Sequence, residues 1–160
     1  MAKFYSNGVR LPVFSVNSKN IRILRSPSDF YRNLLELTKT ARSRISLSSL
    51  YIGNDMMSKE MVSKAVLNKR ENPGLKLNVV LDFYRATRDF KNSSVQTLKP
   101  LINMKSVFSH IDICLFLNPK HNILSGYLPE RVKEIFGVQH SKIYAFDDNV
   151  ILSGFFLRFL

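Results

Sequence analysis

The chain has 160 residues, of which 45% are hydrophobic and 22% charged, and its formal net charge is +12. These proportions are typical of one globular domain, and the single cysteine excludes a disulfide-stapled scaffold. No apolar run approaches the roughly 20 residues of a membrane-spanning helix, and the basic excess favours a phosphate-bearing partner: nucleic acid, an anionic membrane surface or a small phosphorylated substrate.

The start of the chain is basic. The first acid, Asp29, is preceded by Lys3, Arg10, Lys19, Arg22 and Arg25. Together with several serines, this composition is typical of a mitochondrial targeting segment, and it also fits a chain that is basic throughout. A strand is predicted over Asn20–Leu24, where Ile21 and Ile23 alternate with polar residues, so a removable segment must end before it. We therefore assign residues 1–13 to a presequence remnant and residues 14–160 to one domain.

Periodicity predicts alternating helices and strands in the remainder of the chain. Strands are predicted over Arg44–Tyr51, Leu75–Leu81, Ile111–Leu117, Val138–Phe146 and Asn149–Leu152. Helices are predicted from Pro27 with Ser26 as N-cap, over Met57–Arg70, over Ser93–Leu101 near Pro100, and over Pro129–Phe136, with a polar loop from Asp82 to Asn92. The alternation indicates an α/β layered domain in which helices flank a mixed, mostly parallel sheet. A turn at Asp147-Asp148-Asn149 predicts an antiparallel hairpin at the end.

One stretch near the end of the chain carries residues suited to phosphoryl chemistry. His140 and Lys142 are two residues apart, so on an extended strand both side chains project from the same face. An imidazole can attack phosphorus or protonate a leaving oxygen, and an ammonium stabilises the charge that builds on the non-bridging oxygens. Asp147 lies at the turn, where it either reaches back to this pair or braces the hairpin. Gly154 follows seven residues later.

This spacing resembles the HKD motif of the phospholipase D superfamily. Further blocks, in the same order along the chain, resemble the mitochondrial phosphatidylglycerophosphate synthases of that superfamily: Ile23–Tyr31, Ser48–Gly53, Leu81–Arg88, Leu128–Arg131 and Gly137–His140. The resemblance runs from about Phe14 to Gly154, nearly the whole chain. It implies a phospholipase D-like layered domain, in agreement with the predicted elements.

The resemblance also implies an activity: transfer of a phosphatidyl group from CDP-diacylglycerol to glycerol 3-phosphate, which gives phosphatidylglycerophosphate and CMP. In the superfamily one HKD histidine bonds covalently to phosphorus, and the histidine of a second HKD motif acts as acid and base. No metal or organic cofactor is implied, because the lysines supply the positive charge. Carried onto this sequence, His140 is the nucleophile or acid–base, Lys142 binds phosphate and Asp147 is the supporting carboxylate. The implied location is the mitochondrion, peripheral on the inner membrane.

Residues at the ends of two predicted strands are candidates for substrate binding. Asp82, Arg85 and Arg88 follow the strand Leu75–Leu81, where α/β sheets place ligand-binding loops, and Tyr51 ends an earlier strand. We expect the basic loop of the first three residues to receive a phosphate of the CDP group or glycerol 3-phosphate, and Tyr51 to hydrogen-bond the substrate. The alternative is an ordinary solvated loop capped by Asp82, with Tyr51 at a strand edge.

Two departures from the family pattern concern activity. Phe156 stands where the motif ordinarily has an asparagine, within an apolar ending, Phe155–Leu160, that is typical of a truncated product. The chain also carries one HKD motif where the family has two, since His110 and His121 lack the paired lysine and aspartate. Because the loss of one acid–base role typically lowers the rate by about 10²–10⁴-fold, we expect the chain alone to be nearly inactive.

Three functions therefore stay open. The first is the N-terminal catalytic part of a phosphatidyltransferase that acts on CDP-diacylglycerol and glycerol 3-phosphate at an anionic membrane surface. The second is a catalytically dead fragment that retains lipid binding. The third is a homodimeric phosphodiesterase or nuclease, in which two copies pair their motifs across a two-fold axis. The blocks outside the motif favour the first function and make nucleic acid the least expected partner.

Overall fold

The computed structural model describes residues 5–6, 9–10, 14–118 and 138–154. The chain divides into two compact units, Met1–Tyr31 and Arg32–Leu160. The helix predicted over Pro129–Phe136 and the family-like block Leu128–Arg131 lie outside the described residues. Each unit is considered by itself below.

The first unit holds little regular structure in its described part. It contains β1 (Tyr5–Ser6), which pairs antiparallel with β2 (Val9–Arg10), the 3₁₀ helix η1 (Ser18–Asn20) and the beginning of α1. The strand predicted over Asn20–Leu24 is wrong. Ile21 and Ile23 are 61% and 76% exposed, so the alternating pattern buries neither side chain. Pairing this stretch with a neighbouring strand would therefore not be stabilised by burial.

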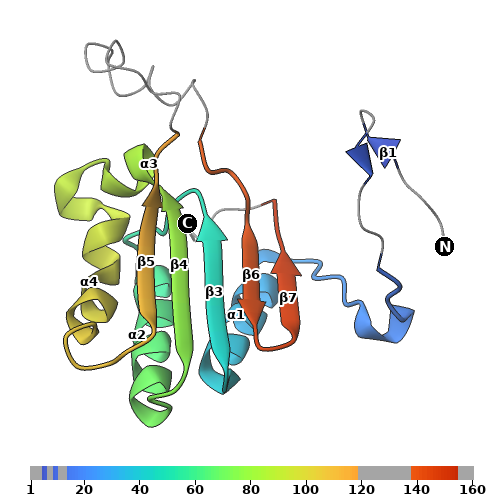
Figure 1. Ribbon diagram of the computed structural model, residues 1–160, viewed down its shortest axis with the longest axis horizontal. Coiled ribbons are helices and arrows are strands. Elements are labelled where there is room, and N and C mark those ends of the chain that lie inside the picture. The colour runs from blue at the N-terminus through green and yellow to red at the C-terminus, as the bar shows by residue number, and fades with distance from the viewer. Residues whose placement is uncertain (1–4, 7–8, 11–13, 119–137, 155–160) are drawn as a thin grey trace. The chain divides into compact units, whose positions relative to one another are not determined.

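The second unit is built on one five-stranded sheet, shown in Figure 1. Its strands are β3 (Arg44–Ser49), β4 (Lys76–Asp82), β5 (Ile111–Phe116), β6 (Ile143–Phe146) and β7 (Asn149–Leu152). Their order is β5-β4-β3-β6-β7. β3, β4 and β5 are parallel, β6 is antiparallel to β3, and β7 turns back beside β6. The predicted α/β class, with a mostly parallel sheet and a final hairpin, is confirmed.

Helices connect the parallel strands, and one further helix precedes them. They are α1 (Pro27–Thr40), α2 (Met56–Glu71), α3 (Phe83–Thr87), the 3₁₀ helix η2 (Phe90–Asn92) and α4 (Ser94–Met104). In Figure 1 α2 passes behind the sheet, and α4 packs on α2 and against β5. The loop predicted from Asp82 to Asn92 is wrong over most of its length, because α3 and η2 form within it. Asp82 starts α3 by accepting the N–H of Arg85 at 3.0 Å.

Local signals explain where the helices begin but not where α4 ends. Ser26 Oγ accepts the N–H of Asp29 at 3.1 Å, as expected for an N-cap before a proline. Asp55 caps α2 through the N–H of Ser58 at 2.9 Å. α4 runs past Pro100 to Met104, although an end was predicted near the proline. Burial of the apolar side chains beyond Pro100, Leu101 and Met104 among them, outweighs the missing N–H.

Burial alternates along the central strands and defines two faces of the sheet. Leu47, Val79 and Tyr144 lie at paired positions of β3, β4 and β6 and are at most 4% exposed. We call their side the helix face, because α2 covers it (Figure 1). Ser48 and Val80, one position along, point to the opposite face and are half-buried.

Lys69, on α2, is a buried cation whose role is structural. It is 0% exposed, and its Nζ donates to the main-chain oxygens of Pro73 at 2.7 Å and Leu75 at 2.6 Å. Lys69→Met keeps the length of the side chain but leaves both carbonyls without this donor. We expect the free energy of unfolding, measured in urea, to fall by about 2 kcal/mol. Lys59→Met, on the exposed side of the same helix, is the control and should change it by less than about 0.5 kcal/mol.

Candidate active site

The strand order brings His140 and Lys142 to the edge of the sheet where β3 and β4 end. β6 runs antiparallel to β3, and its first residue, Ile143, pairs with Ser48 near the end of β3. Lys142 and His140 lie one and three residues before Ile143, so this register places them at the carboxyl ends of the parallel strands. Figure 1 shows β6 starting at that edge of the sheet. Open α/β sheets bind their ligands at this edge.

His140 and Lys142 contact each other, as their spacing predicts. Lys142 Nζ lies 3.0 Å from His140 Nδ1 and 3.2 Å from Nε2, and it donates to the main-chain oxygen of His140 at 3.0 Å. Lys142 is 7% exposed, whereas His140 is exposed. A buried ammonium therefore contacts an imidazole that a substrate can reach.

The contact constrains the protonation states of the pair. A ring nitrogen needs a lone pair to accept a hydrogen bond, so a charged Lys142 can donate only to a neutral imidazole. Neutral imidazole is also the form that attacks phosphorus. Burial lowers the pKa of Lys142, because desolvation disfavours the ammonium. A phosphate oxygen bound beside Nζ offsets that desolvation, since it supplies a charged partner.

Two further buried side chains lie near Lys142 on the helix face. Tyr144 is 0% exposed, and burial raises the pKa of its hydroxyl, although a hydrogen bond with Ser49 acts in the opposite direction. Ser49 is also 0% exposed, and its Oγ donates to the main-chain oxygen of Tyr51 at 3.2 Å. The net effect is a raised pKa, so the phenol stays neutral.

A polar cluster holds the same segment from the opposite face. Gln139 Nε2 donates to Ser48 Oγ at 2.7 Å and to Ser141 Oγ at 2.5 Å, and the two hydroxyls lie 2.9 Å apart. The main-chain N–H of Gln139 donates to Asp82 Oδ2 at 3.1 Å. We call these four residues the Gln139 cluster. They tie the residues on either side of His140 to the ends of β3 and β4.

Asp82, predicted to bind substrate, lies inside this cluster. It is 2% exposed, its Oδ1 accepts the N–H of Arg85 and its Oδ2 accepts the N–H of Gln139. Both carboxylate oxygens are therefore engaged with main-chain donors. Of the two interpretations that the sequence left open, the capping role is the one that the structure shows.

The other three predicted substrate-binding residues lie at the same edge of the sheet. The Arg85 guanidinium carbon is 5.0 Å from the centroid of the Tyr51 ring, within the range of a cation–π interaction. Arg88 is the C-cap of α3 and is half-buried. Since Tyr51 follows β3, and α3 follows β4, two basic side chains and an aromatic ring lie on the elements that leave the ends of these strands.

Asp147 lies at the other end of β6 from His140, so the structure does not bring it to the pair. Its carboxylate accepts the main-chain N–H groups of Arg42, Ser43 and Arg44 at 2.8, 2.8 and 2.9 Å and the Ser43 hydroxyl at 2.7 Å. Burial by itself raises the pKa of Asp147, but the hydrogen bonds from Arg44, Arg42 and Ser43 outweigh it and hold the pKa well below its usual value. Asp147 therefore braces the hairpin against the start of β3, which is one of the two roles that the sequence left open for it.

Gln139 and Ser141 were not singled out from the sequence. A signal was available: Gln139, His140, Ser141 and Lys142 are four consecutive polar residues at the start of a predicted strand. Such a segment presents polar groups to both faces, so each face needs hydrogen-bonding partners. The identity of those partners, Ser48 and Asp82, depends on strand order and is not visible in the sequence.

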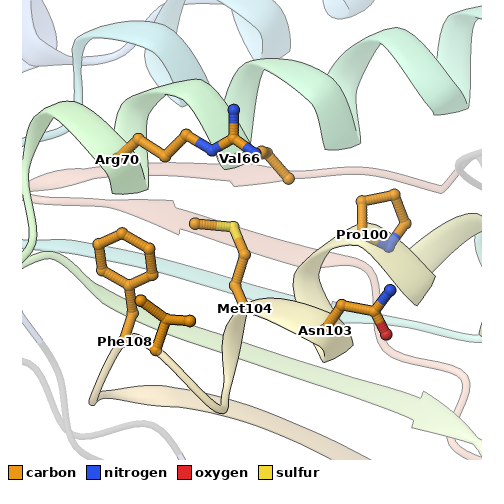
Figure 2. Close-up of a pocket in the computed structure, with 7 residues that line it drawn as sticks. Val66, Arg70, Pro100, Asn103, Met104 and Phe108 are labelled. Atoms are coloured by element: carbon orange, nitrogen blue, oxygen red, sulfur yellow. The ribbon is translucent and has the colours of Figure 1, made fainter.

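The described residues also hold no metal-binding cluster, and a cavity between two helices lies away from the predicted site. Within the described ranges, no group of three or more His, Cys, Asp or Glu side chains is placed to hold a metal ion. A cavity of about 460 Å³ lies between α2 and α4 (Figure 2), and Val66, Arg70, Pro100, Asn103, Met104 and Phe108 line it. No residue of this lining belongs to the predicted site.

Comparison with known proteins identifies relatives of the chain. No family model matches the chain. It is 36% identical over 151 residues to the mitochondrial CDP-diacylglycerol–glycerol-3-phosphate 3-phosphatidyltransferase of Gallus gallus, which covers 90% of this chain and 27% of that protein. It is 35% identical over 145 residues to the Schizosaccharomyces pombe enzyme of the same name, with 89% of this chain and 28% of that protein covered.

A solved structure agrees in fold. The crystal structure of phosphatidylserine synthase from Haemophilus influenzae superposes with a TM-score of 0.65 at 25% identity, covering 84% of this chain and 28% of that one. The chain thus spans only about a quarter of the length of the curated relatives that it matches. The matched region nevertheless includes 90% of the residues of this chain. The chain therefore belongs to the family of CDP-diacylglycerol–glycerol-3-phosphate 3-phosphatidyltransferases.

Proposed function

We propose that the chain supplies one half of the catalytic site for phosphatidyl transfer from CDP-diacylglycerol to glycerol 3-phosphate, which yields phosphatidylglycerophosphate and CMP. The observation that carries this proposal is the contact between the buried Lys142 ammonium and the exposed His140 imidazole at the carboxyl edge of the sheet. The names of the relatives supply the reaction. The second histidine that the mechanism needs belongs to the rest of such an enzyme.

In the proposed first step, a nitrogen of neutral His140 attacks the phosphorus that carries diacylglycerol. A P–N bond forms while the P–O bond to CMP breaks, and the second histidine protonates the leaving oxygen. In the second step that histidine removes the proton from a hydroxyl of glycerol 3-phosphate. The hydroxyl oxygen then attacks phosphorus, and the P–N bond to His140 breaks. Lys142 stabilises the charge on a non-bridging oxygen in both transition states.

Arg85 and Arg88 are the proposed contacts for the anionic groups of the two substrates, with Tyr51 holding Arg85. Stacking on a ring uses the face of a guanidinium, whereas phosphate is bound by its in-plane N–H groups, so the two contacts are compatible. This arrangement fixes the direction of the Arg85 side chain before substrate binds. A positioned guanidinium binds phosphate with a smaller loss of side-chain entropy.

Arg85→Ala should therefore raise KM for the substrate more than it lowers kcat. We expect KM for CDP-diacylglycerol to rise by about tenfold, which corresponds to one charge-assisted hydrogen bond. Arg70→Ala, which removes the same charge from the far end of α2, is the matched control, and its KM should stay within about two-fold of the parent chain. Equal effects of the two variants would show that net charge, rather than a contact of Arg85, governs binding.

The proposed location is the mitochondrion, at the surface of the inner membrane. The Gallus gallus, Cricetulus griseus and Homo sapiens relatives are named as mitochondrial. A net charge of +12 favours adsorption to a surface of anionic lipids, and CDP-diacylglycerol is itself an anionic lipid. Of the helices that the structure describes, none has the length and hydropathy to cross a bilayer.

The proposal is tested by supplying the missing part of the enzyme. The chain is mixed with the segment that follows the matched region in the Gallus gallus relative, and with CDP-diacylglycerol labelled in its phosphatidyl phosphorus. We expect labelled phosphatidylglycerophosphate and, after a quench in base, label on His140. The corresponding N-terminal segment of the relative, used in place of the chain, shows that the two pieces assemble.

Other outcomes select the alternatives. Binding of labelled lipid without transfer, unchanged by His140→Ala, would support a lipid-binding fragment. Metal-independent cleavage of DNA by a stable dimer of the chain would support a homodimeric phosphodiesterase. If the relative's own segment is active in the mixture and the chain is not, the phosphatidyltransferase proposal fails.

A further inference from the structure

Asp82 joins three parts of the fold at one buried point. It is the last residue of β4, and its main-chain N–H donates to the oxygen of Leu50 at 3.2 Å, just beyond β3. Its Oδ1 caps α3 through Arg85, and its Oδ2 accepts the N–H of Gln139. A carboxylate that is 2% exposed needs such donors, because burial without hydrogen bonds is strongly unfavourable.

We propose that Asp82 is a positioning residue that aims His140 through the main chain of Gln139, an inference that rests on the proposed function. Gln139 is the neighbour of His140, so an anchor on its N–H restricts the backbone angles that direct the imidazole. The side chain of Gln139, bonded to Ser48 and Ser141, fixes the same segment through a second set of hydrogen bonds. The Gln139 cluster therefore sets where the imidazole meets phosphorus, and Lys142 follows because it bonds to the His140 oxygen.

The geometry separates this role from substrate binding. Both Asp82 oxygens accept main-chain hydrogens, and the carboxylate is enclosed. A negative charge that faced the phosphates of CDP-diacylglycerol would repel them, whereas a negative charge behind the backbone orients peptide N–H groups without meeting the substrate. A misplacement of about 1 Å in a catalytic group typically lowers the rate by about 10²-fold, so loss of the anchor should appear in kcat.

Three variants of the full chain distinguish positioning from simple stabilisation. Asp82→Ala removes both acceptors, and Asp82→Asn retains one oxygen. Asp55→Ala is the matched control, since Asp55 also caps a helix through both carboxylate oxygens, to the N–H and hydroxyl of Ser58, but has no described bond to the segment that carries His140. Gln139→Ala is a fourth variant, which removes the side-chain bonds of the cluster but keeps the main-chain N–H that Asp82 accepts. Asp82→Asn serves as the test of Asp82 if Asp82→Ala does not fold.

The first readout needs no substrate. The imidazole ¹⁵N resonances of His140 and the hydrogen exchange of the Gln139 amide are recorded by NMR for each chain. We expect Asp82→Ala to shift the His140 resonances and to speed Gln139 exchange by about tenfold or more beyond any change in global stability. Gln139→Ala should also shift the His140 resonances, and Asp55→Ala should leave them at their parent positions.

The second readout is the transfer assay with the supplied segment. Asp82→Ala should lower kcat by about 10²-fold with KM within about three-fold, and Asp82→Asn should recover part of that loss. Asp55→Ala should keep kcat within about two-fold. Unmoved His140 resonances in Asp82→Ala, or in Asp82→Asn if the former is unfolded, would overturn the positioning role, as would equal kcat in the Asp82→Ala and Asp55→Ala chains. Absence of transfer in the parent chain would count against the proposed function alone, because the NMR comparison stands without it.

Discussion

Replacing His140 with alanine is expected to lower phosphatidyl transfer by at least about 10³-fold, the largest catalytic effect of any single change in the chain. In the proposed mechanism the imidazole forms the bond to phosphorus, and it is this ring that contacts Lys142. Initial rates in the supplied-segment assay measure the loss. Because His140 is exposed, thermal unfolding should be nearly unchanged, which separates a chemical loss from a folding loss.

A second histidine provides the control for this change. His110 lies just before β5 with a positive φ of 61°, a conformation that asparagine also tolerates. His110→Asn therefore removes an imidazole from the chain with little strain. Its transfer rate should stay within about two-fold of the parent. A His140→Ala chain that kept a tenth or more of the parent rate would remove His140 from the mechanism.

Asp147→Ala is expected to have the largest effect on stability among the changes considered, a loss of about 3 kcal/mol in the free energy of unfolding. Three main-chain N–H groups and one hydroxyl lose a charged acceptor, and the start of β3 loses its link to the hairpin. Asp147 also has a φ of 50°, which alanine adopts less readily than aspartate. Denaturation in urea measures the change. The exposed neighbour Asp148 gives the control, and Asp148→Ala should cost less than about 0.5 kcal/mol.

The same residue makes stability depend on pH. The hydrogen bonds hold the pKa of folded Asp147 below that of the unfolded chain, which is about 3.9. The stabilisation is therefore complete above that pH and is lost as the pH falls below it toward the folded pKa. The difference in unfolding free energy between the parent chain and Asp147→Asn should shrink progressively from about pH 5 to pH 2. A difference that stays constant over this range would mean that the carboxylate charge is not what stabilises the hairpin.

The stability and activity predictions are independent because Asp147 and His140 lie at opposite ends of β6. Loss of Asp147 loosens the hairpin end of the strand, whereas His140 is held by Lys142 and the Gln139 cluster at the other end. Asp147→Ala should thus reduce the amount of folded chain without changing KM of the molecules that remain folded. Asp147, the aspartate of the HKD pattern, thus stabilises the fold of this chain.

Local features of the sequence were sufficient to predict most of the architecture. The alternation of strands and helices predicted the α/β class, and Ser26 before Pro27 correctly marked the start of α1. The two-residue spacing of His140 and Lys142 predicted their contact. These successes depend on periods and caps, which a few consecutive residues determine. The strand predicted over Asn20–Leu24 is wrong for a related reason. Alternation indicates a strand, but a strand forms only where a neighbouring strand pairs with it and one of its faces is buried.

By itself, the sequence determined the fold class and predicted that His140 and Lys142 lie together, as the structure shows. Tertiary structure alone decided that Asp82 and Gln139, which are 57 residues apart, share a hydrogen bond, and that Asp147 reaches the start of β3 across more than 100 residues. Periodicity along a chain records which face a residue occupies, but it carries no information on which strand lies next to which. The order β4-β3-β6 supplies that information, and with it the roles of both aspartates.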